Sequence, residues 1–117
     1  YKTCHMKYAL SVPFVERFWE LAATDAAGGI AGWVGQITAN SFMKREFGKK
    51  LIEEFFPRVD LTHVIDAAGA YIPGHGTPTV LLFGRARPPQ AELVRAVLGI
   101  RGEPGTPDVP ARGAVWT

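Results

Sequence analysis

The sequence has very little cysteine: Cys4 is the single one among 117 residues, so no internal disulfide can form. A lone free thiol is typical of a reducing compartment, and we expect a cytoplasmic protein. No apolar run reaches the ~18 residues that a membrane-spanning helix needs. The polar stretch Tyr1–Lys7 also lacks the apolar region of a secretory signal. We therefore expect no membrane partner.

Sequence motifs of several enzyme classes are missing too. The glycines form neither Gly-x-Gly-x-x-Gly nor a Walker pattern, and this argues against a phosphate-binding loop. Cys4 and His5 have no second Cys or His pair at zinc spacing, so we expect no metal site. Ser41, His75 and Asp66 supply the residue types of a small serine hydrolase, which stays an alternative. No Gly-x-Ser-x-Gly surrounds Ser41, which is better explained as a helix N-cap.

Neither sign of charge dominates the chain. The formal net charge is +2, from 13 Lys and Arg against 11 Asp and Glu. The densest cationic stretch, residues 44–50, is interleaved with Glu46 and followed by Glu53 and Glu54, which is typical of a solvated helix face. This charge permits DNA contact but does not indicate it. An apolar fraction of 47% is typical of a globular protein and predicts an ordered core.

Hydrophobic periodicity predicts a first helix over Ala9–Asp25. Pro13 falls in its first turn, where a missing N–H costs least, and Gly28–Gly29 follows its end. Apolar residues at helical spacing define its expected buried stripe: Leu10, Phe14, Val15, Phe18, Leu21 and Ala22.

The rest of the chain alternates between strands and helix. Apolar and β-branched runs predict three strands: Ile30–Thr38, Val59–Asp66 and Thr79–Phe83. Phe42–Phe56 predicts a helix with Asn40 and Ser41 as N-caps and Pro57 at its end. Strand-helix-strand order implies a parallel crossover, whereas the loop before the third strand is helix-free and permits antiparallel pairing. We expect an α/β fold whose parallel sheet ends in an antiparallel strand at its edge.

The loop Gly69–Pro78 has the most unusual composition, with three glycines and two prolines around an aromatic residue. One interpretation is a tight connection between two strands. The other is a binding loop at the end of the sheet, where Tyr71 offers a stacking face and His75 a polar contact. Thr77 and Thr79 suit either phosphate contacts or the hairpin.

Four stretches carry a resemblance to a known family: Gly35–Phe56, Val59–Asp66, Gly74–Val80 and Val94–Pro104. Together they resemble adenine-N6 DNA methyltransferases of the large restriction-modification and BREX-type phage-exclusion class. The resemblance implies that residues 1–100 are the C-terminal half of a Rossmann-like class I methyltransferase domain, with flanking helices and the last strand inserted antiparallel. Residues 101–117 are expected to be a loop-like tail.

The same resemblance gives the loop a role. In this family the loop before the antiparallel strand forms one wall of the pocket for a flipped-out adenine, and Tyr71 matches the aromatic that stacks on the base. Pro73, His75 and Thr77 are the other residues that we assign to contact with the target base or DNA.

Two family motifs are absent from the chain. Asn/Asp-Pro-Pro-Tyr, which binds the target amine, has no counterpart, because Pro88–Pro89 follows Arg87 and precedes Gln90. The glycine-rich loop that holds S-adenosylmethionine is missing as well. We expect this cofactor in the intact protein only, no catalytic residue here, and no activity of the isolated chain. Expected partners are DNA, the remainder of the polypeptide and a second copy through an exposed edge at Ile30–Thr38; a non-catalytic DNA- or protein-interaction module is the other alternative.

Overall fold

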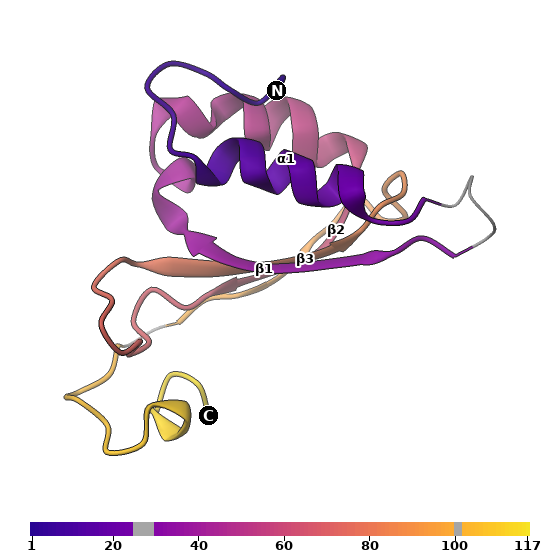
Figure 1. Ribbon diagram of the computed structural model, residues 1–117. Coiled ribbons are helices and arrows are strands. Elements are labelled where there is room, and N and C mark those ends of the chain that lie inside the picture. The colour runs from indigo at the N-terminus through magenta and orange to yellow at the C-terminus, as the bar shows by residue number, and fades with distance from the viewer. Residues whose placement is uncertain (25–29, 100–101) are drawn as a thin grey trace.

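The computed structural model describes residues 1–24, 30–99 and 102–117, and shows a layer of helices over one face of a twisted sheet (Figure 1). The sheet contains four strands: β1 (Trp33–Ala39), β2 (Asp60–Asp66), β3 (Thr79–Arg85) and β4 (Arg95–Val97). The helical layer contains one α-helix, three 3₁₀ turns and one π-helical turn: α1 (Ser11–Leu21), η2 (Asn40–Met43), η3 (Glu46–Gly48), the π-helical η4 (Leu51–Phe55) and η5 (Phe56–Arg58). A further 3₁₀ turn, η6 (Pro110–Arg112), lies in the C-terminal tail. None of the helices in the described ranges is long and apolar enough to cross a membrane.

The predicted first helix is confirmed but is shorter than expected. It begins at Ser11, which places Pro13 in the first turn, and it ends at Leu21 rather than Asp25. Ala22 already has extended backbone angles, with φ −71° and ψ 146°. The predicted stop at Gly28–Gly29 lies outside the described residues.

The predicted buried stripe of α1 is largely wrong. The helix buries a different set at helical spacing: Val12, Val15, Glu16 and Trp19. Of the predicted stripe, Val15 is buried and Ala22 packs against the core, but the large members are exposed: Leu10, Phe14, Phe18 and Leu21. The buried face contains a carboxylate, and this is why a search for apolar residues at helical spacing does not identify it. A second apolar stripe is thereby left on the outer side of the helix.

Hydrogen bonds make the burial of Glu16 tolerable. Its Oε2 accepts from the backbone N–H of Thr3 at 3.0 Å and from the Thr3 hydroxyl at 2.6 Å. Burial raises the pKa of Glu16, but the bonds from Thr3 and from the Lys2 backbone outweigh burial, and the pKa lies below its ordinary value of 4.5. The N-terminal segment is thus tied to α1 through an ionised carboxylate.

The predicted helix over Phe42–Phe56 is broken into short segments. Arg45 has extended backbone angles, with φ −118° and ψ 149°, and separates η2 from η3. At Gly48 the chain passes so close to the backbone carbonyl of Phe42 that a Cβ would overlap it. The predicted caps are wrong as well: Asn40 and Ser41 lie inside η2, and no side-chain cap bond forms. The helical stretch runs past Pro57 to the end of η5.

All three predicted strands are confirmed, and residues 95–97 form one more short strand, β4. The strand order is β1-β3-β2-β4, with β3 antiparallel to both β1 and β2, and β4 parallel to β2. The prediction of an antiparallel strand at the sheet edge is therefore wrong, because β3 lies between its neighbours. β1 and β2 run parallel to each other, but not side by side. A direct hairpin from β2 places β3 next to it, and β1 then pairs with the free side of β3.

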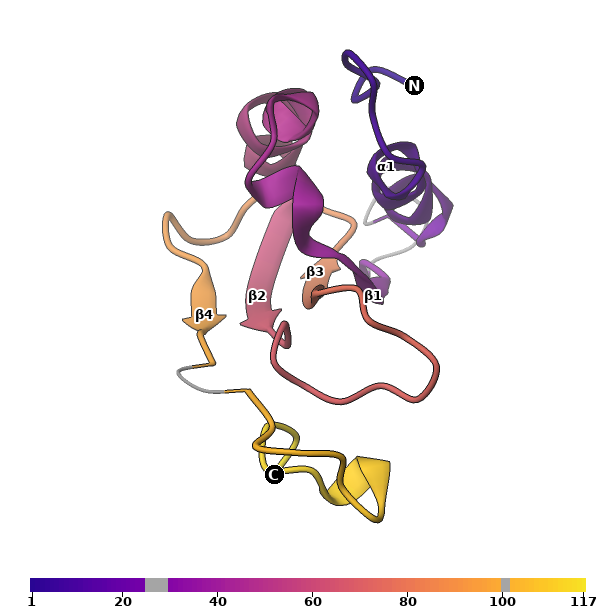
Figure 2. The ribbon, with the colours of Figure 1, turned by 90° about the vertical axis from the view of Figure 1, so that its left-hand side faces the viewer.

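The core lies between the sheet and the helical layer. It is formed by Val12, Val15, Trp19, Val34, Phe42, Leu51, Val80, Leu82 and Ala86. The Trp19 ring meets Phe55 and Phe56 edge-on, at centroid distances of 6.2 and 6.3 Å. α1 lies above β1, and the η4–η5 stretch lies above the β2 side, as the end-on view shows (Figure 2). β1 therefore runs beneath α1 at one edge of the sheet.

Candidate functional site

The connection from β2 to β3, residues 67–78, is an ordered loop at the carboxyl end of β2. Its base is closed by the Ala67 N–H, which donates to the Thr79 carbonyl at 3.1 Å. The carboxylate of Asp66 accepts from the Ala68 N–H at 2.9 Å, so the loop begins with an Asx-type turn.

The tip of this loop folds back on itself. Ile72 and His75 form an isolated antiparallel bridge, and the His75 N–H donates to the Ile72 carbonyl at 3.1 Å. Gly74 sits within this turn at φ 71°, the left-handed conformation that glycine adopts without a steric penalty. The glycine-rich composition thus encodes a defined turn.

A cavity of about 250 Å³ lies between the loop and the carboxyl end of β1. Its lining is apolar with a polar rim: Ile37, Thr38, Ala39, Ile72, His75, Thr77 and Thr79. The structure therefore brings two of the predicted site residues, His75 and Thr77, to one cavity. Three loop residues, the first residue of β3 and three residues of β1 meet there because β1 and β2 are parallel and end at the same side of the sheet. Its volume is close to the lower limit of small-molecule sites, roughly 300 Å³.

The other two predicted site residues, Tyr71 and Pro73, do not line this cavity. Tyr71 is half-buried, and its backbone carbonyl accepts from the Trp116 indole N–H at 3.3 Å. Pro73 is exposed at the loop tip. Sequence reasoning missed the β1 residues of the cavity, because nothing in their own stretch marks them as neighbours of a loop so far along the chain.

The C-terminal tail lies against the loop. The Glu103 N–H donates to the Gly69 carbonyl at 3.0 Å, and its carboxylate accepts from the Val115 N–H at 2.8 Å. The Glu103–Gly69 bond and the Trp116–Tyr71 bond attach the tail to the loop, and the Glu103–Val115 bond links the two ends of the tail. The tail is thus positioned to fix the loop conformation.

The three residue types of a serine hydrolase do not assemble. Ser41 lines a different cavity, together with Lys7 and Tyr8, whereas His75 lines the loop cavity. Asp66 accepts from its own loop backbone. Within residues 1–24, 30–99 and 102–117, no hydrogen bond joins any two members of this trio. The hydrolase alternative has no geometric support.

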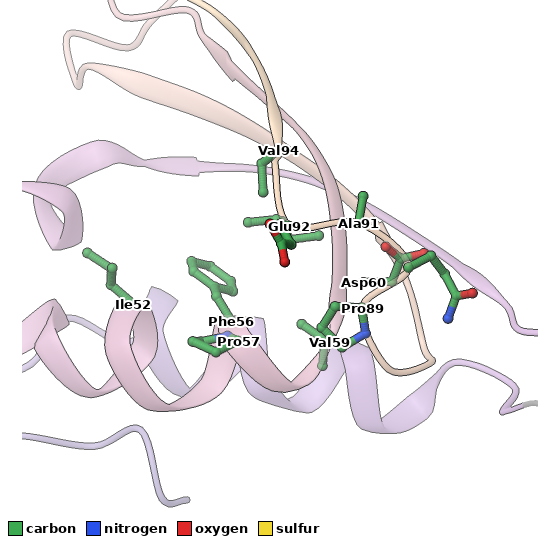
Figure 3. Close-up of a pocket in the computed structure, with 11 residues that line it drawn as sticks. Ile52, Phe56, Pro57, Val59, Asp60, Pro89, Ala91, Glu92 and Val94 are labelled. Carbon is green, nitrogen blue, oxygen red and sulfur yellow. The ribbon is translucent and has the colours of Figure 1, made fainter.

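Another cavity, of about 660 Å³, opens between the helical stretch and the segment that leads into β4 (Figure 3). Ile52, Phe56 and Val59 line one side, and Glu92 and Val94 the other. At one end of it the Arg87 Nε donates to the Asp60 carboxylate at 2.8 Å, which ties the chain after β3 to the start of β2.

No predicted site residue lines that cavity. The sequence offered one signal for it, the Pro88–Pro89 pair that turns the chain back toward β2. In the described part of the chain, His, Cys, Asp and Glu side chains form no group of three or more that could hold a metal ion.

The structure defines a class, mixed α/β proteins with a glycine-rich loop at the carboxyl side of the sheet, and sequence comparison then relates the chain to a methyltransferase. Over 120 aligned residues, including 99% of this chain, the sequence is 58% identical to the adenine-specific methyltransferase PglX of Streptomyces coelicolor. The chain spans 10% of that protein's length. No family model matches the chain. No solved structure matches it either. The chain is therefore homologous to a segment of an adenine-specific methyltransferase, and the resemblance inferred from the sequence motifs is confirmed.

Proposed function

We propose that the chain is part of the catalytic domain of an adenine-N6 DNA methyltransferase that uses S-adenosylmethionine. The observation that carries this proposal is the 58% identity to PglX over 99% of the chain. On the same resemblance we propose that the intact protein acts in the cytoplasm, in restriction-modification or BREX-type phage exclusion. Other segments of the polypeptide would supply the cofactor loop and the Asn-Pro-Pro-Tyr motif.

The sheet supports this proposal. β3 is inserted antiparallel between β1 and β2, which are parallel to each other. This is the arrangement implied for the end of a Rossmann-like methyltransferase sheet. The carboxyl ends of β1 and β2 meet at the loop cavity, and ligands of open α/β sheets bind at the carboxyl ends of the strands.

In the proposed role the loop forms a wall for an adenine that has left the duplex, because its exocyclic amine cannot reach a methyl donor inside the stack. His75 and Thr77 would contact the base or its backbone from the cavity. Tyr71 would stack on the base, and Pro73 would shape the tip beside it. Catalysis of such a transfer depends chiefly on positioning and electrostatics, so a displaced wall slows the reaction.

The loop cavity does not fit S-adenosylmethionine by itself. The loop cavity has no carboxylate in its lining that could accept bonds from ribose hydroxyls. The purified chain should therefore bind no cofactor in a calorimetric titration. It should also transfer no labelled methyl group to DNA, and a clear transfer signal from the chain alone would contradict the proposal that it is an incomplete part.

The surface formed by α1 and β1 has the features of an interface with a large partner. β1 is an edge strand without charge or proline in its sequence, so nothing blocks further pairing. Directly above it, the outer stripe of α1 exposes Phe14 and Phe18, whose rings lie 6.0 Å apart. A contiguous apolar helix stripe over an open sheet edge is typical of an interface. We propose that the remainder of the methyltransferase polypeptide packs here.

In the isolated chain we propose that a second copy occupies the same edge. Ile37 and Val97 lie in one transverse row at the two edges of the sheet and are 51% and 58% exposed. Ile37→Lys should shift the chain from dimer to monomer in sedimentation velocity, because a charge at the β1 edge opposes pairing. Val97→Lys is the matched control and should leave the dimer intact. Two variants that sediment alike would rule out the β1 edge as the dimer contact.

A further inference from the structure

We propose that a cationic groove between the N-terminal segment and η2–η3 binds the sugar-phosphate backbone of DNA. The groove has a volume of about 1040 Å³ and is lined by Met6, Lys7, Tyr8, Ala9, Ser41, Lys44, Arg45, Glu46 and Phe47. The inference rests on the proposed function insofar as DNA is the substrate, but it assigns this substrate a contact surface away from the loop cavity.

The fold sorts the charges that alternate in the sequence. Lys44 and Arg45 line the cationic groove with Lys7, against the single carboxylate of Glu46. Lys50 instead lines a separate small cavity together with Glu54, and Glu53 lines another with Lys49, on the far side of Lys44 and Arg45, which border both that cavity and the groove. The cause is the extended backbone at Arg45, which breaks the helix that would have spread both signs over one face. A run that is mixed in sequence thus becomes a local excess of positive charge.

The three groove cations have no carboxylate partner within the described part of the chain. The ion pairs found there are Arg17–Glu20 and Arg87–Asp60. Lys7, Lys44 and Arg45 are all exposed, so a phosphate can reach them without breaking an existing bridge. Exchange of condensed counterions for such cations drives protein binding to DNA.

The remaining lining adds groups that suit a nucleic acid. Tyr8 is 41% exposed and lines the groove, where an aromatic ring can pack against a sugar or base. The Ser41 hydroxyl is a donor for a phosphate oxygen.

The groove and the loop cavity lie at the same end of the sheet. η2 follows directly from β1, and the Asn40 N–H donates to the Pro78 carbonyl, the last residue of the loop, at 3.0 Å. Both the N-terminal segment and the loop lie near this end of β1 in Figure 1. A DNA strand held in the cationic groove would therefore run toward the loop that we assign to the target base.

The test is fluorescence anisotropy of a labelled DNA duplex with the whole 117-residue chain, titrated from about 50 to about 200 mM salt. The test variant combines Lys7→Gln, Lys44→Gln and Arg45→Gln. The matched control combines Lys2→Gln, Lys50→Gln and Arg58→Gln, which removes the same charge from the neighbouring cavity that Glu16 and Glu54 also line. Circular dichroism of both variants verifies the fold.

The test variant should bind about tenfold or more weakly at low salt, and its salt slope should shrink by about three, one for each lost phosphate contact. The control should keep both affinity and slope. Equal weakening of the two variants would show a general charge effect and overturn the groove, as would unchanged binding of the test variant or no binding of the original chain. The proposed function is tested separately by methyl transfer, so a negative result for the groove does not contradict the proposed function.

Discussion

Gly84→Ala should lower the free energy of unfolding by about 3 kcal/mol, enough to unfold much of a marginally stable chain. Gly84 lies in β3 directly beneath Trp19, and a Cβ there would sit 2.5 Å from the Asp60 carbonyl oxygen and 2.7 Å from Trp19 Cζ2. Neither neighbour can yield cheaply. Asp60 is paired with β3 in the sheet, and the Trp19 indole N–H donates to the Arg85 carbonyl at 3.3 Å.

Urea unfolding followed by tryptophan fluorescence measures this loss. Gly76→Ala is the matched control, because a Cβ at that loop position meets nothing within 4 Å, and it should change stability by less than about 0.5 kcal/mol. Two variants of equal stability would show that the close packing of α1 on β3 is not as described.

The double variant Phe14→Ser, Phe18→Ser should leave the stability of the isolated chain nearly unchanged but impair its assembly with the remainder of the methyltransferase. In the isolated chain these side chains are 52% and 43% exposed, so their loss should change the unfolding midpoint little. Placed in PglX in exchange for its matching segment, the same variant should lose methyl transfer by about 100-fold or more. The reason is that burying each Phe against the remainder contributes roughly 1.5–3 kcal/mol.

The control for this experiment is Leu93→Ser with Leu98→Ser. Both residues are apolar and more exposed, at 86% and 69%, but they flank β4 on the opposite edge of the sheet. This control should keep methyl transfer in the same exchanged enzyme. A stripe variant as active as the control would mean that α1 faces water in the intact protein.

The strands could be predicted from sequence because their signal is local. The apolar runs at β1, β2 and β3 are bounded by turn residues, and no competing pattern overlaps them. The order of the strands in the sheet could not be predicted in the same way, because it depends on contacts between distant parts of the chain. Whether β3 pairs on one side or on both depends on β1, which is separated from it by the entire helical stretch.

The helix predictions were wrong where tertiary contacts override the hydrophobic periodicity of the sequence. α1 buries Glu16 because Thr3 stabilises its carboxylate, a contact that no hydrophobic pattern contains. The stretch after β1 breaks at Arg45 and turns tightly at Gly48, although its aromatic residues recur at helical spacing. In both cases the sequence shows which residues are apolar, but not which of them the core needs.

The residues of the candidate site likewise fall into those that the sequence predicted and those that it did not. The loop was evident from its glycines and prolines, and His75 and Thr77 do line a cavity. The facing residues Ile37 and Thr38 could not be foreseen, since the pairing of β1 with β3, which sets Ala39 opposite Thr79, brings them to the loop. The cationic groove depends likewise on Lys7 meeting Lys44 across a long sequence separation.

The most direct measurement of the central claim is methyl transfer by PglX in which this chain replaces the matching segment. The exchanged enzyme would receive labelled S-adenosylmethionine and DNA, and the modified nucleoside would be identified by mass spectrometry. We expect N6-methyladenine at a rate within about tenfold of the original enzyme, a change of about 1.4 kcal/mol in the barrier, and none when the segment is deleted. An exchanged enzyme that is folded and binds the cofactor but forms no N6-methyladenine would contradict the central claim.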